Sequence, residues 1–176
     1  MRYLLCIFIF YLFSCLSIAE ENSFYISQVG TSARMLAIGD IQGFDQSAIS
    51  VFENPASLSF LEFASVSLFS TTLFNEVEYA NLAVGIKTFL GNVSLGYMSS
   101  AVSSIPKTFL TVLGDYTYVQ SNSDYAVSLD LYKVGYSLPT KRNFKVGFSY
   151  SYFLNQIDTL KGSGSNYDFG IFYSFT

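Results

Sequence analysis

The sequence predicts an all-β protein, and more specifically part of an antiparallel transmembrane β-barrel with an irregular N-terminal segment inside it. Two observations come first. Beyond residue 61 the chain alternates between apolar and polar residues, which is the pattern of half-buried strands. Charged residues make up only 12% of the 176 residues, whereas aromatic residues make up 18%. A soluble protein normally has about twice that share of charges, so part of this surface is expected to face something other than water.

The first nineteen residues resemble an export signal. A positively charged start precedes the apolar run Tyr3 to Leu16, and the small residues Ser17 and Ala19 stand before Glu20. We therefore predict a signal peptide over residues 1–19 and export from the cytoplasm. The apolar run is short for a transmembrane helix, although an uncleaved anchor is the alternative.

A second route of processing is open. Leu12 to Cys15 resembles a bacterial lipobox, in which Cys15 would receive a lipid and become the new N-terminus. The two cysteines, Cys6 and Cys15, both lie in this leader. Cleavage after Ala19 would leave no cysteine, so no disulfide would stabilise the mature chain.

Residues 20–61 are predicted to form a compact, irregular plug, and residues 62–176 to form barrel strands. The plug contains Gly30 and Arg34 and ends in the turn Asn54-Pro55-Ala56. Proline fixes its own φ and pushes the preceding residue out of the helical region. Asn54 should therefore be extended, and Pro55 should open a short helical turn.

Six runs of alternating residues are expected to be strands, most of them near the ten residues that a tilted strand needs to cross a bilayer. They are Phe63–Phe74, Ala80–Leu90, Val93–Tyr97, Tyr125–Leu138, Phe144–Leu154 and Tyr167–Phe175. The fourth run changes its phase in the middle, which predicts a β-bulge near Asp130.

The connections are expected to alternate in length. Gly91-Asn92 and Pro139–Asn143 are predicted to be short turns. Asn75–Tyr79, Ser99–Asp124 and Asp158–Asn166 are predicted to be longer loops. Short turns at one end and long loops at the other are typical of outer-membrane barrels.

A soluble β-sandwich or lipocalin-like barrel is the rival interpretation, because its strands alternate as well. Such a protein needs charged residues on its outer face. In the last two runs the non-apolar face consists mostly of Gly, Ser and Asn, with only Lys145 and Asp168 charged. This pattern favours the membrane barrel.

The composition excludes most catalytic chemistry. The chain has no histidine, and cleavage would remove both cysteines, which excludes His-based triads, Cys nucleophiles and most zinc sites. We predict no enzyme activity, no cofactor and no metal centre; Asp115, Asp124 and Asp158 lack the spacing of a calcium motif. Gly162–Gly164 is expected to be a flexible loop. A net charge of −4 with scattered cations argues against nucleic acid.

Two segments resemble a known family. Gly30–Phe60 and Lys145–Phe175 are similar to PorV/PorQ-type outer-membrane proteins, within the FadL-like superfamily of long-chain fatty-acid transporters. The matching plug residues are Gly30, Ala33, Arg34, Gly39, Ala48, Asn54, Pro55 and Ala56. Asp40 and Ser57 depart from the family pattern.

The resemblance implies that this chain is the N-terminal half of a longer barrel. Members of the group are roughly twice as long, and a bacterial barrel needs at least about eight strands to close. Six strands would leave two open edges, which lipid cannot satisfy. A missing C-terminal half or a second chain is therefore expected to pair with them.

The resemblance also implies a location in the bacterial outer membrane, with lipid around the barrel, and transport of hydrophobic or amphipathic small molecules. An adaptor that binds exported proteins, as PorV does, and a purely structural or surface-exposed barrel are the alternatives. Gly30, Arg34, Asn54 and Pro55 are the candidate plug or lumen residues. Arg34 would pair with Asp130 or Asp168 in the wall, or bind an anionic head group.

Overall fold

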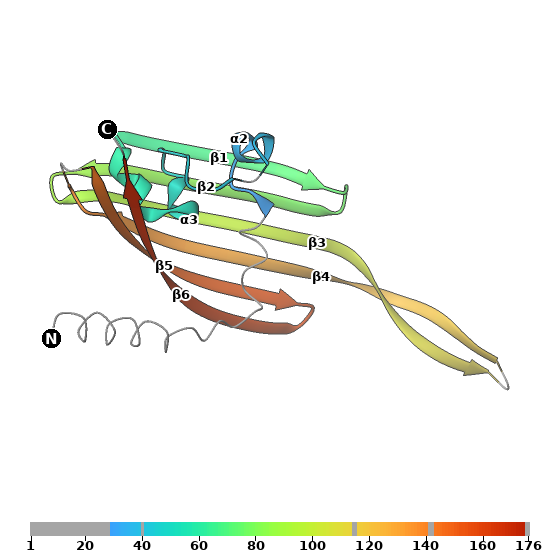
Figure 1. Ribbon diagram of the computed structural model, residues 1–176. Helices are drawn as coiled ribbons and strands as arrows, with labels where there is room; N and C mark the ends of the chain where they lie inside the picture. The colour runs from blue at the N-terminus through green and yellow to red at the C-terminus, as the bar shows by residue number, and fades with distance from the viewer. Residues whose placement is uncertain (1–28, 40, 114–115, 141–142, 175–176) are drawn as a thin grey trace, which may run out of the picture.

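The computed structural model describes residues 29–39, 41–113, 116–140 and 143–174, which form one curved antiparallel sheet with short helices against one of its faces (Figure 1). The predicted signal peptide, the lipobox with Cys15, Asp40 and Asp115 lie outside these residues. The helices are α2 (Ala33–Ala37), α3 (Ser50–Glu53) and the 3-10 helix η2 (Pro55–Phe60). The strands are β1 (Ala64–Leu73), β2 (Val77–Thr88), β3 (Gly91–Leu113), β4 (Tyr116–Ser137), β5 (Phe144–Ile157) and β6 (Leu160–Tyr173).

The strands follow one another in chain order, and each pairs antiparallel with the next. The all-β prediction is confirmed. Within the described residues β1 and β6 do not pair with each other, so the sheet is not closed into a barrel. No helix in the described ranges has the length and apolar character needed to span a membrane.

The two faces of the sheet differ as the alternation predicted. We call the face against which α3 and η2 pack the inner face. In β5, Gly147, Ser149 and Ser151 lie buried on the inner face, while Phe148 and Tyr150 are exposed on the outer face. In β2, in the first part of β3 and in β6, successive residues likewise alternate between a more buried inner side and a more exposed outer side. Small polar residues therefore form the surface on which the helices rest.

The hydrophobic core lies between the N-terminal segment and the inner face. Ile49, Val51 and Phe52 pack with side chains from four strands, including Met98 of β3 and Leu131 of β4. Burial of such side chains stabilises the folded state by about 1.5–3 kcal/mol each, before the cost of ordering them. The helical segment is thus held mainly by apolar contact with the sheet.

The predicted bulge near Asp130 is wrong. Asp130 pairs in unbroken register with Ser99 of β3 and Leu154 of β5. The phase changes because the apolar residues change face. Leu129 and Leu131 point inward to the core cluster, whereas Val134 is exposed on the outer face.

The predicted long loop Ser99–Asp124 is also wrong, because most of it is strand. Residues 103–113 and 116–126 continue β3 and β4 as a two-stranded arm that extends beyond the rest of the sheet (Figure 1). Its register shifts between Val102 and Ile105 and between Lys107 and Thr108. The arm lacks an apolar stripe because neither of its faces packs against the described core, so alternation could not reveal it.

The other predicted loops are shorter than expected. β1 and β2 are joined by residues 74–76, β2 and β3 by residues 89–90, and β5 and β6 by residues 158–159. The predicted loops Asn75–Tyr79 and Asp158–Asn166 are therefore largely strand, and Gly91-Asn92 begins β3. Pro139 and Thr140 do lie outside the strands, after β4. The hairpins differ in strand length, whereas the three fully described connections are short.

Two inner-face glycines let the N-terminal segment approach the sheet closely. A Cβ at Gly147 would overlap the carbonyl carbon and oxygen of Pro55. A Cβ at Gly170 would overlap the side-chain oxygen of Asn54. The backbone of η2 therefore lies directly on β5 and β6.

We expect the substitution Gly147→Ala to destabilise the fold by about 1–3 kcal/mol, because the added methyl group overlaps backbone atoms that cannot rotate away. Gly162→Ala in β6 is the matched control, since a Cβ there meets nothing within 4 Å. Urea unfolding in detergent micelles would measure both. Equal midpoints for the two variants would contradict the close contact.

Candidate functional site

A cavity of about 600 Å³ lies where the junction between α3 and η2 faces strands β4 to β6. Its residues come from the N-terminal segment and from the inner face and the free edge of the sheet. They are Gln42, Gly43, Phe52, Glu53, Asn54, Pro55, Leu131, Lys133, Ser151, Phe153, Asn166, Asp168, Phe169, Gly170 and Ile171. The volume lies within the range of about 300–1,000 Å³ that small-molecule sites occupy.

The apolar part of the cavity has a buried end and an exposed end. Phe52, Leu131 and Phe153 are buried at the core cluster. Phe169 and Ile171 of β6 are exposed and belong to the outer face. The cavity therefore runs from the core toward the free edge of the sheet.

The polar part contains an ion pair within the sheet, between a buried lysine and a half-buried aspartate. Lys133 Nζ lies 2.6 Å from Asp168 Oδ2, with side-chain exposures of 9% and 31%. Ser149 Oγ donates to the same carboxylate oxygen at 3.1 Å, and Asn166 Nδ2 donates to Oδ1 at 2.9 Å. These neutral donors satisfy further lone pairs of Asp168, which a buried ion pair requires.

Lys133 was missed by the sequence reasoning, although a signal was present. It shares its parity in β4 with Leu131 and Gly135, which are inner-face residues. Val134 and Tyr136, which alternate with it, are the apolar residues from which the phase of this run was predicted.

The predicted pairing of Arg34 with Asp130 or Asp168 is wrong. Lys133 takes Asp168, and Asp130 accepts a hydrogen bond of 2.7 Å from the Tyr97 hydroxyl. Arg34 is exposed on α2 and forms no ion pair with any residue that the structure describes. It lines a small neighbouring hollow together with Asp45 and Glu53.

Glu53, at the end of α3, joins three parts of the N-terminal segment. Its Oε1 accepts a hydrogen bond of 2.5 Å from Thr31 Oγ1, and its Oε2 accepts one of 2.8 Å from the Gly43 backbone. The Thr31 carbonyl in turn accepts a hydrogen bond of 2.8 Å from Asn81 Nδ2 of β2. Glu53 was not singled out by the sequence analysis, since one carboxylate before a proline turn gives no pattern.

Asn54 and Pro55 adopt the predicted turn. Asn54 is extended, with φ −142° and ψ 106°, and Pro55 opens η2. Asn54 Oδ1 accepts from the Ala56 backbone at 3.0 Å, and Asn54 Nδ2 donates to the Ile171 carbonyl at 3.2 Å. One side chain thus caps η2 and ties it to β6. Gly30 is buried beside Thr31 with φ 97°, a conformation that glycine favours.

Among the described residues there is no group of three or more His, Cys, Asp or Glu side chains that could hold a metal ion. Comparisons of the chain with models of protein families, with curated proteins and with solved structures find no match. What the cavity does must therefore be argued from its own residues.

We expect Lys133→Met to destabilise the fold by about 1–3 kcal/mol, because Asp168 would keep its charge in a half-buried site without a cation. The double variant Lys133→Met with Asp168→Asn should recover most of this loss. Urea midpoints and a double-mutant cycle would measure both effects.

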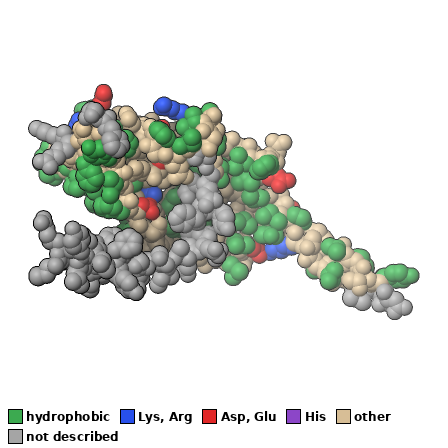
Figure 2. Space-filling model, viewed as in Figure 1, with side chains coloured by type: hydrophobic (Ala, Val, Ile, Leu, Met, Phe, Trp, Pro, Cys, Tyr) green, Lys and Arg blue, Asp and Glu red, His purple; other side chains and the backbone are tan. Residues whose placement is uncertain are grey.

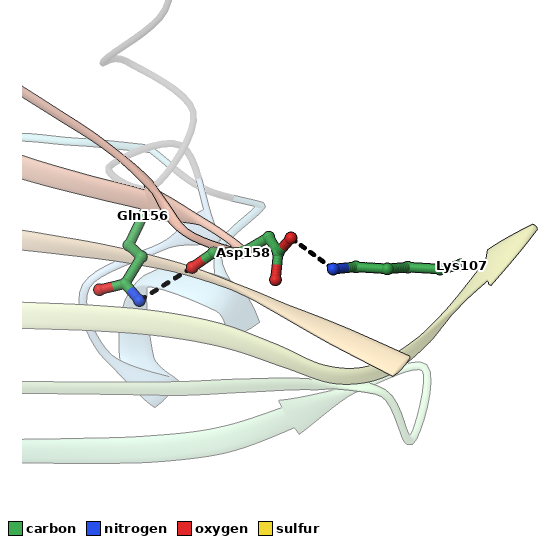
Figure 3. A network of polar contacts seen from close by, with 3 residues as sticks. All are labelled: Lys107, Gln156 and Asp158. Carbon is green, nitrogen blue, oxygen red and sulfur yellow. Dashed lines mark hydrogen bonds and ion pairs between the residues drawn. The ribbon is translucent and has the colours of Figure 1, made fainter. Parts of the chain in front are cut away.

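The control is the exposed pair that joins the base of the arm to the turn between β5 and β6. Lys107 Nζ lies 2.5 Å from Asp158 Oδ2, with side-chain exposures of 43% and 38%, and Gln156 Nε2 donates to the Asp158 carbonyl (Figure 3). Lys107→Met should cost less than about 1 kcal/mol. If Lys107→Met lowered the free energy of unfolding as much as Lys133→Met does, burial would not explain the contribution of the Lys133–Asp168 pair.

Proposed function

We propose that this chain forms part of the wall and the plug of an outer-membrane β-barrel that transports hydrophobic or amphipathic small molecules. The observation that carries the proposal is the outer face of the sheet, which is apolar and exposed from one edge to the other. Figure 2 looks onto the side of the molecule that carries the helices and shows hydrophobic side chains over part of the sheet there as well, with charged ones at their margin.

The register aligns the outer side chains in rows across the sheet. One row contains one apolar or tyrosine residue from each strand: Val66, Val84, Leu95, Val134, Tyr150 and Tyr167. All six are exposed, from 38% for Tyr150 to 79% for Tyr167. A surface of this kind in water would promote association, whereas hydrocarbon would solvate it.

The next row supports an interfacial position. Tyr97, Tyr132 and Tyr152 are neighbours on three adjacent strands. Asp130 follows on the outer face of β4, where Tyr97 donates a hydrogen bond to it. Tyrosines next to the first charged residue match the aromatic girdle that borders the apolar band of a membrane barrel.

The free edge of β1 supports a longer or assembled wall. β1 has neither a charge nor a proline, whereas β6 carries Lys161 and the inward-directed Asp168. Edges that face water are normally protected by such residues. Further strands, from a C-terminal half or a second chain, would satisfy the unpaired backbone groups in lipid.

In the proposed mechanism a hydrophobic compound binds in the cavity beside Phe52 and Phe153. The N-terminal segment then shifts and lets the compound pass. The hydrogen bonds of Glu53 and Asn54 are the tethers that such a shift has to break. The resemblance to FadL-like proteins supports this scheme.

A second candidate function is favoured by the arm. Leu110 and Val119 face each other across the arm, and both are more than 60% exposed. Tyr116 and Tyr118 are also exposed there. An exposed two-stranded projection that carries these apolar and tyrosine side chains suits contact with another protein, as in a PorV-like adaptor of secretion. A purely structural barrel would need neither the arm nor the cavity.

Fractionation of native cells tests the location. The full-length native product should be found in the outer membrane, and its mobility on gels should change on boiling, because a closed barrel resists detergent at room temperature. A soluble product whose mobility does not change with heat would overturn the proposal.

Val134→Arg, at the centre of the outer face, should destabilise the protein in lipid vesicles by about 2–4 kcal/mol, the cost of a cation at the bilayer midplane. The same change at Ser121, which is exposed on the arm, should stay within about 0.5 kcal/mol. Urea unfolding in vesicles would measure both. A neutral effect of Val134→Arg would mean that water faces this row.

A further inference from the structure

We infer that the cavity between α3, η2 and strands β4 to β6 selects compounds with an apolar body and one positive charge, and disfavours carboxylates such as fatty acids. The inference rests on the proposed function, since it assumes that the cavity binds a small molecule. It assigns the chemical class of that molecule from the charges on the cavity wall.

The described wall has more negative than positive charge. Three charged side chains line the cavity: Glu53, Lys133 and Asp168. The single cation, Lys133, is already paired with Asp168 at 2.6 Å and is buried. Lys133 could bind a ligand carboxylate only by giving up its ion pair with Asp168. The negative charge of Asp168 would then lack a partner.

Glu53 is the carboxylate of this wall that forms no ion pair with any residue that the structure describes. Its hydrogen-bond donors are the Thr31 hydroxyl and the Gly43 backbone, both of them neutral. Neutral donors stabilise the charge without cancelling it. Each carboxylate oxygen has two lone pairs, so Glu53 keeps acceptor capacity toward the cavity.

The surroundings do not reverse this balance. Arg34 and Asp45 line the small hollow on the other side of Glu53, and they contribute one charge of each sign. A ligand carboxylate would therefore enter a site with a net negative wall, whereas a ligand cation would be attracted to Glu53.

The apolar part of the wall suits a cation as well. Phe52 and Phe153 are buried at the end of the cavity nearest the core. The face of an aromatic ring attracts an alkylammonium group. Leu131 provides further contact for an uncharged body. One end of the ligand would thus meet Glu53 while the remainder lies against these rings.

Three small probes of nearly equal shape test the inference: benzyltrimethylammonium, benzyl alcohol and phenylacetate. Their binding to the refolded full chain in nonionic detergent would be measured by ligand-observed NMR at low salt. Benzyltrimethylammonium should bind about tenfold more tightly than phenylacetate, with benzyl alcohol between them. The ratio should fall as salt is added, because the cavity is open to solvent ions.

Glu53→Gln should remove most of the preference for the cation while leaving benzyl alcohol binding within about twofold. Glu78→Gln is the matched control, because Glu78 is an exposed carboxylate of β2 outside the cavity wall. It should leave all three affinities unchanged. If Glu53→Gln fails to refold, the salt dependence of the unsubstituted chain decides the question.

The outcomes separate the two proposals. Binding of all three probes with equal affinity, or tighter binding of phenylacetate, would overturn the charge selection and leave capture in the cavity intact. Absence of binding by every probe would overturn capture itself, and this inference with it. A preference that survives Glu53→Gln or is lost in Glu78→Gln would show that the charge responsible lies elsewhere.

Discussion

The close contact between the N-terminal segment and the inner face is the constraint on which the rest of the structure depends. The backbone at Pro55 can lie on β5 only because residue 147 is a glycine, and Asn54 can reach the β6 edge only because residue 170 is one. Serines at neighbouring inner positions add hydrogen-bonding groups without bulk; Ser94 Oγ, for example, donates to the Ala48 carbonyl at 3.0 Å. Small side chains on this face are thus needed for contact.

This constraint determines where the large side chains can lie. A face with glycine and serine across its centre offers little apolar surface, so the inner core is confined to the region around Phe52 and Leu131. Most large apolar residues of β5 and β6 consequently occupy the outer face, where Phe148 and Phe169 pair directly across the two strands. The distribution is inverted relative to a soluble sheet, in which the larger side chains would face the covered side.

The sequence revealed the parts of the fold whose residues alternate in a single phase. The parity of β5 and β6 and the turn at Asn54 and Pro55 followed from side-chain size and from proline geometry. The arm did not follow, because its residues pack on no core and alternate weakly. Parity in β4 indicates that Lys133 lies on the inner face. Its ion pair with Asp168 and the tethers of Glu53 depend instead on contacts between residues that are not neighbours in sequence, and no local pattern encodes such contacts.

The proposed plug and the proposed ligand site have one carboxylate in common. Glu53 holds Thr31 and Gly43 through hydrogen bonds and also provides the unpaired negative charge of the cavity wall. A cation bound beside Glu53 would draw electron density away from both acceptor oxygens and weaken the bonds that hold the segment together. A neutral compound would leave them unchanged. Binding of the favoured ligand and release of the plug would then be coupled at Glu53, with the coupling limited to the difference in affinity between the tethered and released states.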